Sequence, residues 1–100
     1  MKQGLKLVAT NYRCRLGEID LILWDKDTLV FAEVRLRKNS RFGGAAASIT
    51  GQKQLKLQRA AAHYLQHLGK TPPCRFDAVL LDGLGEANLE WIRGAFSAEP

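Results

Sequence analysis

The spacing of hydrophobic and polar positions changes along this chain, and each spacing predicts a different element. Residues 4–14 alternate weakly and predict an extended first segment. Residues 17–24 and 28–37 are strongly apolar and have the length of strands, and a short hydrophilic stretch separates them at residues 25–28. These two segments are therefore predicted to form a β-hairpin.

The second half of the chain predicts a helix followed by two strands. From about residue 49 or 50 onward, apolar side chains recur at spacings of three and four and so share one helical face: Leu57, Ala60, Ala61, Tyr64, Leu65 and Leu68. Gly69 can end this helix. Residues 75–82 predict another strand, and residues 88–93 a last short one. The order predicts an α/β fold in a single domain over residues 1–100, with a mixed β-sheet, a central hairpin and a packed helix.

Two acidic residues, Asp20 and Glu33, stand thirteen positions apart in the two strands of the predicted hairpin. If the turn is centred on Lys26 and Asp27, counting outward along both strands places Asp20 opposite Glu33. The Cβ atoms of opposed residues lie about 4.5–5.5 Å apart. Lys-Asp is not a favoured pair for a tight hairpin turn, and a slip of one residue would move one acid to the other face.

Side-chain alternation sorts this hairpin into two faces. One face carries the acids, together with other residues of both strands: Glu18, Ile22, Trp24, Phe31, Arg35 and Arg37. In this register Glu18 lies opposite Arg35. The other face is expected to be apolar: Ile19, Leu21, Leu23, Val34 and Leu36.

Two carboxylates that face each other inside a sheet repel, so the pair needs a cation or a functional reason. Carboxylates suit Mg²⁺ or Mn²⁺, and such an ion could polarise a phosphate oxygen and lower the pKa of a bound water. Arg35 could stabilise a phosphoryl-transfer transition state, but it is a poor general base. The alternative is an ordinary polar hairpin face in which Arg35 pairs with Glu18 and Asp20 and contributes little.

Composition narrows the class of protein. The chain has 100 residues, 46% of them hydrophobic and 25% charged, which is ordinary for one globular domain. Its net charge of +5 suits a polyanion such as nucleic acid, although proteins without such a partner can be equally basic. No apolar run of membrane-spanning length and no secretory signal core is present, so no membrane contact is expected. Cys14 and Cys74 form no Cys-x-x-Cys motif, which favours free thiols and a cytoplasmic location, with a single disulfide left open.

The spacing Asp-x(12)-Glu-x-Arg after a Gly-Glu-Ile-Asp strand resembles the core of PD-(D/E)XK nucleases. That core is a loose motif, but a longer pattern resembles the YraN family of small bacterial proteins, which are related to archaeal Holliday-junction resolvases. The pattern covers nearly the whole chain: Gly-Glu-Ile-Asp-Leu-Ile, Phe-Ala-Glu-Val-Arg, Ser-Ile-Thr, Lys53, Leu57, Ala60, Tyr64-Leu65 and Arg75-Phe76-Asp77.

The resemblance implies a restriction-endonuclease-like fold and metal-dependent hydrolysis of DNA phosphodiester bonds, with branched DNA as a candidate substrate. By this correspondence Asp20 and Glu33 are metal ligands, the carbonyl of Val34 is a third, and Glu18 is an extra acid. Arg35 takes the place of the superfamily's lysine. If that lysine orients or deprotonates water, an arginine does this badly.

A second departure concerns the start of the chain. Proteins similar to this one usually have a helix before the segment that begins here, and that helix is expected to be absent. In such relatives it packs on the sheet and can bring another acid to the site. Its absence would expose sheet surface, which a homodimer could cover.

Basic residues flank the acidic pair on both sides. Arg37, Lys38 and Arg41 follow Glu33 directly, and Lys53 and Lys56 lie in the first part of the predicted helix. Together they could hold DNA phosphates, in which case binding would weaken steeply with salt. The alternative is an ordinary solvated loop and helix face.

Three further features favour structural roles. His63 and His67 stand four apart, a spacing that can bind zinc, but no third ligand lies nearby in the sequence. Asp77 is expected to support Arg75 or the helix end. Trp24 and Trp91 could stack on bases, although packing is the simpler role for both.

The best hypothesis is an endonuclease-like DNA-binding hydrolase that uses Mg²⁺ or Mn²⁺. The second is a nucleic-acid-binding module that keeps the fold without the chemistry, as the arginine at position 35 favours. The third is a protein-interaction domain with no nucleic-acid contact.

Overall fold

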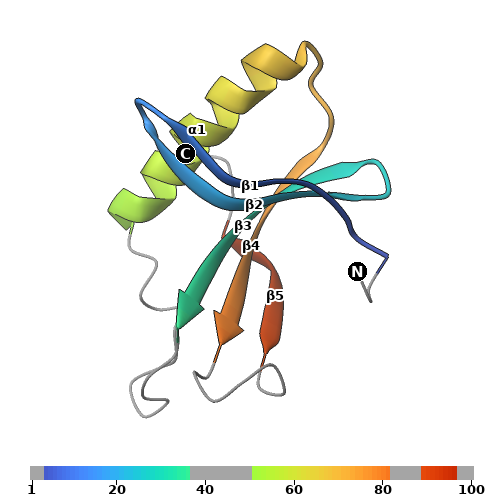
Figure 1. Cartoon of the computed structure of the whole chain (residues 1–100), viewed down its shortest axis with the longest axis vertical. Helices are drawn as coiled ribbons and strands as arrows, with labels where there is room; N and C mark the ends of the chain where they lie inside the picture. The colour runs from blue at the N-terminus through green and yellow to red at the C-terminus, as the bar shows by residue number, and fades with distance from the viewer. Residues whose placement is uncertain (1–3, 37–50, 82–88, 97–100) are drawn as a thin grey trace.

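The computed structural model describes residues 4–36, 51–81 and 89–96, which form five β-strands and one α-helix (Figure 1). In chain order these elements are β1 (Lys6–Cys14), β2 (Gly17–Asp25), β3 (Thr28–Leu36), α1 (Gly51–Leu68), β4 (Cys74–Leu81) and β5 (Glu90–Phe96). The elements predicted from hydrophobic spacing are confirmed. The last strand lies slightly later in the chain than expected.

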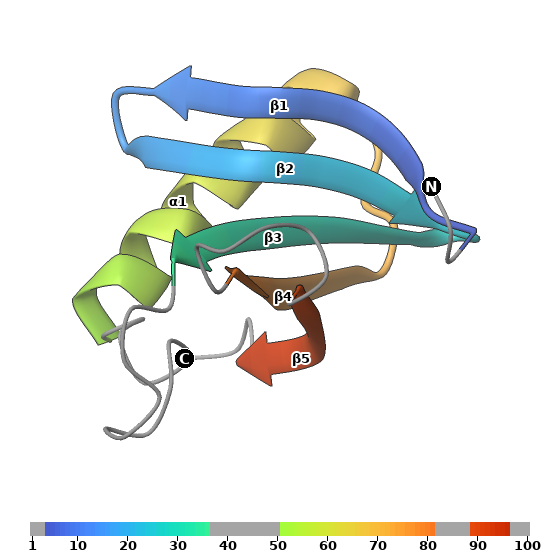
Figure 2. The same cartoon turned by 60° about the horizontal axis from the view of Figure 1, so that its bottom comes forward.

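The strands form one sheet in the order β1-β2-β3-β4-β5. Neighbours pair antiparallel except β3 and β4, which run parallel. Two parallel strands need a crossover connection between them. Here α1, which follows β3 and precedes β4 in the chain, supplies this connection and lies across one face of the sheet (Figure 2). The predicted mixed α/β fold, with its central hairpin and packed helix, is therefore confirmed.

The β2–β3 hairpin has the register that the sequence predicts. Directly paired positions run from Asp25 and Thr28 at the turn to Leu21 and Ala32. Lys26 adopts a left-handed backbone conformation with φ 55°, which lets a turn without the usual Asn-Gly pair reverse the chain. Counting on from Leu21 and Ala32 brings Asp20 and Glu33 next to each other on the two strands.

One cluster of the core lies between α1 and the sheet, and a second, with Leu23, Val30 and Ala32, contains no residue of the helix. The helix buries Leu57, Ala60 and Ala61 against Ile22 and Phe31, which are themselves fully or almost fully buried. Tyr64, farther along the same helical face, contacts the ring of Tyr12 edge-on at a centroid distance of 5.2 Å. Gly69 ends the helix at φ 79°, where its N–H donates to the carbonyl of Leu65.

Side-chain alternation on β2 breaks at Asp20, and one face prediction was wrong. Ile19 packs in the same helix-side cluster as Ile22, three positions away, whereas regular alternation would put them on opposite faces. The neighbouring strand is irregular at the same level: Asn11, between the pairs that Thr10 and Tyr12 make with β2, has φ 51°. Ile19 therefore packs on the helix side, and Asp20 lies opposite the irregular position of β1.

No helix in the described ranges is both long and apolar enough to cross a bilayer.

Candidate functional site

Asp20 lies where the β2–β3 ladder ends. The last ladder pair is Leu21 with Ala32, and beyond it the backbone N–H of Val34 donates to Asp20 Oδ2 at 2.8 Å. The side chain of Asp20 thus takes the place of a backbone acceptor on β2. In the described part of the chain this is its one hydrogen bond, so Oδ1 is left for another ligand. Val34 had been predicted to contribute its carbonyl; the contact that the structure shows comes from its N–H.

The surroundings of Glu33, on β3, disfavour the charged form of its carboxyl group. Only 13% of its side chain is exposed, and burial raises the pKa of its carboxyl above the ordinary value. The negative charge of Asp20 raises this pKa further, while the positive charges of Arg35 and Lys53 oppose the shift. Asp20 is therefore close enough to Glu33 for the two to repel, as the hairpin register predicts.

Arg35 forms an ion pair with Glu33, but one of its N–H donors has no acceptor among the residues described. Its guanidinium approaches Glu33 Oε1 at 2.9 Å, and its side chain is 26% exposed. Its Nε is buried and has no hydrogen-bond partner among the residues described. A buried donor without an acceptor costs about 1–3 kcal/mol. A ligand with a hydrogen-bond acceptor could therefore bind Arg35 Nε next to the two acids.

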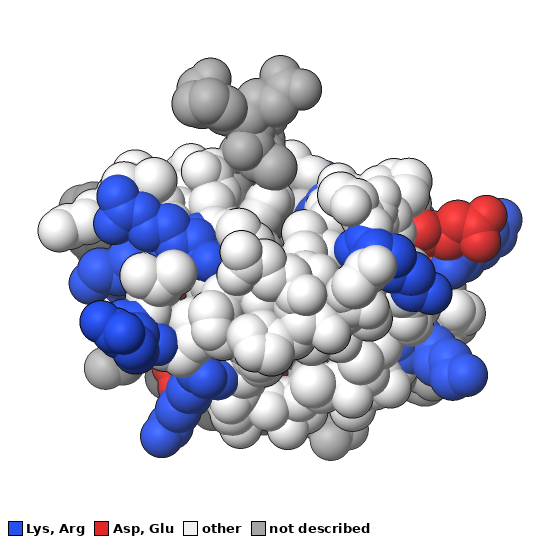
Figure 3. All heavy atoms as spheres, turned by 90° about the horizontal axis from the view of Figure 1, so that it is seen from above, with Lys and Arg blue, Asp and Glu red and all other residues white. Residues whose placement is uncertain are grey.

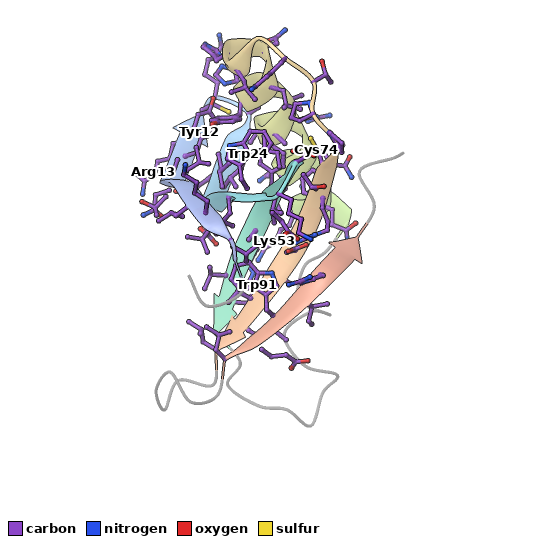
Figure 4. All side chains as sticks on the ribbon, turned by 90° about the vertical axis from the view of Figure 1, so that its right-hand side faces the viewer. Tyr12, Arg13, Trp24, Lys53, Cys74 and Trp91 are labelled. Carbon is purple, nitrogen blue, oxygen red and sulfur yellow. The ribbon has the colours of Figure 1, made fainter. Side chains whose placement is uncertain are left out.

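Glu18 lies apart from this group. It pairs with Arg13, labelled on β1 in Figure 4, at 2.6 Å, and the two side chains are 47% and 78% exposed. The predicted opposition of Glu18 and Arg35 lies beyond the last pair of the β2–β3 ladder, Leu21 with Ala32, and the printed ion pairs of these two residues go to Arg13 and Glu33 instead. Glu18 still adds a small negative potential at Glu33, where it raises the pKa.

The first turns of α1 bring positive charge to the acids. Lys53 and Lys56 are exposed there, and the charge of Lys53 reaches Glu33. The helix can come this close because Gly17 begins β2: a Cβ at position 17 would lie 2.8 Å from the carbonyl oxygen of Lys56. The sequence contains this signal, a glycine before Glu-Ile-Asp, but not the helix it faces. Three other predicted contacts, Arg37, Lys38 and Arg41, lie outside the described residues.

A second acidic cluster on the same sheet is structural. Asp77 on β4 is fully buried. It accepts two bonds from Arg75, at 2.8 and 3.0 Å, one from Trp91 Nε1 at 2.7 Å and one from the N–H of Gly94 at 3.0 Å. The predicted Arg75 contact and the structural role of Trp91 are confirmed. Arg75 also donates to Asp25 at 2.9 Å and lowers the pKa of that carboxyl, a link between hairpin and β4 that sequence reasoning missed.

The two histidines of α1 bond to neighbouring groups through Nδ1. His63 Nδ1 is hydrogen-bonded to the hydroxyl of Tyr12, and His67 Nδ1 to the carbonyl of His63. In the described part of the chain, no group of three or more His, Cys, Asp or Glu side chains is arranged to hold a metal. Cys14 and Cys74 are free thiols.

Comparison with known proteins places the chain in a family. The model of the Uncharacterised protein family UPF0102 matches residues 1–81. A UPF0102 protein of Nitrosomonas eutropha is 61% identical over 95 residues, which cover 95% of this chain and 80% of that protein. One from Nitrosospira multiformis is 61% identical over 92% of this chain and 77% of its own length. A third, from Cupriavidus metallidurans, is 57% identical over 95% of this chain and 69% of its own length. The resemblance to the YraN family is confirmed, and the chain belongs to the UPF0102 family.

Proposed function

We propose that this protein is a metal-dependent nuclease that hydrolyses DNA phosphodiester bonds, with Mg²⁺ or Mn²⁺ held by Asp20 and Glu33. One observation carries the proposal: two half-buried carboxylates repel each other on neighbouring strands, beside a guanidinium whose buried Nε has no partner in the described residues. A structural ion pair would leave neither the repulsion nor the orphaned donor.

The donor set fits a hard divalent ion. Mg²⁺ is commonly bound by one or two carboxylates plus waters and substrate phosphate, so a third protein acid is not needed. Asp20 keeps one oxygen outside its bond to Val34, and Glu33 is poorly stabilised as an anion without a cation. The carbonyl of Val34 stays a predicted third ligand. The bound ion would supply charge neutralisation at the phosphate and an acidified water.

The chain's own residues have separable roles. The Val34 N–H orients Asp20, so that the position of this carboxylate is set by the β3 backbone. Arg35 presents a fixed positive charge and an available Nε–H, which suit a phosphate oxygen and the charge that develops on it. Lys53 and Lys56 lie at the helix turns nearest the acids, where they can contact flanking phosphates. The base that activates water is not Arg35, because a guanidinium group does not give up its proton in proteins.

The test is cleavage of fluorescent duplex, flapped and four-way-junction DNA in Mg²⁺ or Mn²⁺. Asp20→Asn and Glu33→Gln should each abolish metal-dependent cleavage, while Glu90→Gln, at an exposed carboxylate at the start of β5, should leave it unchanged. Cleavage that survives in both site variants would refute the proposal.

One observation favours a second function, a nucleic-acid-binding module without catalysis. Arg35 stands where a lysine is expected and pairs with Glu33, so part of the acidic charge is already neutralised. Salt-sensitive DNA binding without cleavage, retained in Asp20→Asn and Glu33→Gln, would establish this function. An increase of cleavage in Arg35→Lys would show instead that the arginine only limits the rate. No DNA binding at low salt would leave a protein-interaction domain.

A further inference from the structure

A shallow pocket lies at the turn of the β2–β3 hairpin, at the other end of the hairpin from Asp20 and Glu33. The start of β1, the hairpin turn and the connection from α1 to β4 line it: Lys6, Trp24, Lys26, Asp27, Lys70, Thr71, Pro72 and Pro73. The pocket therefore joins segments that are distant in the sequence.

The charges around this pocket are mostly positive. Lys70 Nζ lies 5.7 Å from the centroid of the Trp24 ring, which holds the ammonium group by a cation–π contact. Lys6 is paired directly with Trp24 across β1 and β2, and Lys26 occupies the turn. Asp27 is the one carboxylate in the lining. Within the described ranges, none of these three lysines lies in an ion pair.

The carboxylate of Asp25, which lies next to the turn but outside the pocket lining, is paired with an arginine. Asp25 points its carboxylate at Arg75, 2.9 Å away, and this hydrogen bond lowers its pKa. Its charge is therefore balanced by an arginine outside the pocket. In the described lining, three lysines therefore face a single carboxylate, that of Asp27, and the pocket keeps an excess of positive charge.

The pocket is held in shape by the fold. Leu29 at the start of β3 donates its N–H to the carbonyl of Pro73 at 2.8 Å, which ties the α1–β4 connection to the hairpin. Pro72 and Pro73 restrict the same connection. A site with so little freedom loses little entropy on binding a ligand.

We propose that this pocket binds the phosphate backbone of a single-stranded nucleic acid, with Lys6, Lys26 and Lys70 on phosphates and Pro72 and Pro73 against a sugar. The choice of nucleic acid over another polyanion rests on the proposed nuclease function.

Trp24 and Asp20 are four residues apart on β2, so the two sites lie about 13 Å apart along the strand. Figure 3 shows Lys and Arg side chains on both sides of one face, with uncharged surface between.

The experiment compares two variants that remove the same charge. Lys26→Gln/Lys70→Gln empties the pocket of two ammonium groups. Arg15→Gln/Arg59→Gln removes two exposed guanidinium groups outside it. Binding of a fluorescent 12-nucleotide oligo-dT is measured by anisotropy in EDTA over a series of NaCl concentrations, beside a duplex of the same length. The circular dichroism spectra of both variants serve as the check on folding.

The pocket variant should bind oligo-dT more weakly, and the slope of log affinity against log salt should fall by about 1.4, since a single-strand phosphate contact contributes about 0.7. The arginine variant should keep the wild-type slope. Equal losses in both variants, or an unchanged pocket variant, would overturn the proposal. A greater loss for the duplex than for oligo-dT would overturn the choice of single strands, and polyglutamate bound as tightly would overturn nucleic acid.

A second readout reports on the pocket itself. Oligo-dT should change the tryptophan emission of the wild-type protein, and Trp24→Phe should lose that change; an emission change that persists would place the ligand elsewhere. Failure of the two proposals is distinguishable. A protein that cleaves DNA but binds oligo-dT equally in both double variants has the nuclease site and not this pocket, whereas selective binding without cleavage shows the reverse.

Discussion

The sheet carries two acidic clusters that differ in how fully their charges are satisfied. Asp77 is completely buried and accepts four hydrogen bonds, from Arg75, Trp91 and Gly94. Asp20 accepts one from Val34, and Glu33 is poorly stabilised as an anion. Within the described residues the hydrogen bonds of the first cluster are complete. Those of the second are not, although both clusters are built on the same sheet.

This difference separates structure from function. A buried carboxylate with every lone pair directed at a donor holds elements together, and here it ties β5 to β4, with Arg75 extending the link to the hairpin. A carboxylate pair that repels, beside an unsatisfied guanidinium nitrogen, destabilises the folded protein unless a ligand joins it. Such perturbed groups concentrate at functional sites.

The largest effect on stability is expected at Asp77. Replacement by Ala would leave two guanidinium nitrogens of Arg75, the indole N–H of Trp91 and the N–H of Gly94 without their acceptor, although Arg75 would keep its pair with Asp25. The loss should be about 3–5 kcal/mol, as for other broken buried ion pairs. Urea denaturation measures it, with Asp20→Asn as the matched control. Equal losses in the two variants would remove the distinction between the clusters.

The next effect is stabilisation by metal. Mg²⁺ or Mn²⁺ at about 100 times its dissociation constant should raise the free energy of unfolding by about 2.7 kcal/mol, because it binds only the folded site. Thermal unfolding with and without EDTA measures this shift. Asp20→Asn and Glu33→Gln should lose it and Asp77→Asn should keep it. A shift retained in both site variants would place the metal elsewhere.

Gly17 tests how the helix and the acidic site are joined. The Cβ of Gly17→Ala would meet the carbonyl of Lys56, so either β2 or α1 must move. Such overpacking costs about 1–3 kcal/mol. Gly51→Ala is the control, since nothing lies within 4 Å of its Cβ position. Chemical denaturation of both variants measures the difference in their free energies of unfolding. Equal stabilities would show that β2 or α1 can move away from the added Cβ at no measurable cost.

The smallest effect is a pH dependence from Glu33. Its pKa is raised in the folded state, so the folded protein binds the proton more tightly than the unfolded chain does. Wild-type stability relative to Glu33→Gln should be greatest below the ordinary pKa of 4.5 and decline as pH rises through the folded value. Denaturation in EDTA from pH 4 to 7 gives the slope. The opposite sign would mean that Arg35 and Lys53 outweigh burial and Asp20.

Metal reverses this trend, because the ion binds the ionised carboxylate. Stabilisation by Mg²⁺ should therefore increase over the same pH range in which the metal-free protein loses stability. A stabilisation that is constant with pH would show that Glu33 is not a ligand.

Local patterns in the sequence determined much of this protein. Apolar runs with a polar break predict the hairpin, counting from Lys26 and Asp27 predicts its register, and three-and-four spacing predicts the buried face of the helix. These features depend on residues close together in the chain, where backbone geometry repeats with a fixed period. The proximity of Asp20 and Glu33 follows from the same counting.

Only the tertiary structure decided which charges are satisfied. Asp77 meets Trp91, Arg75 meets Asp25, Gly17 meets Lys56, and Trp24 meets Lys70 across sequence separations that no periodicity encodes. Ile19 also packs on the helix side, against regular alternation, next to the irregular position at Asn11. A sequence states which groups carry charge. Whether each is paired, buried or left for a ligand depends on how the sheet and helix pack, because electrostatic and steric contacts act between neighbours in space.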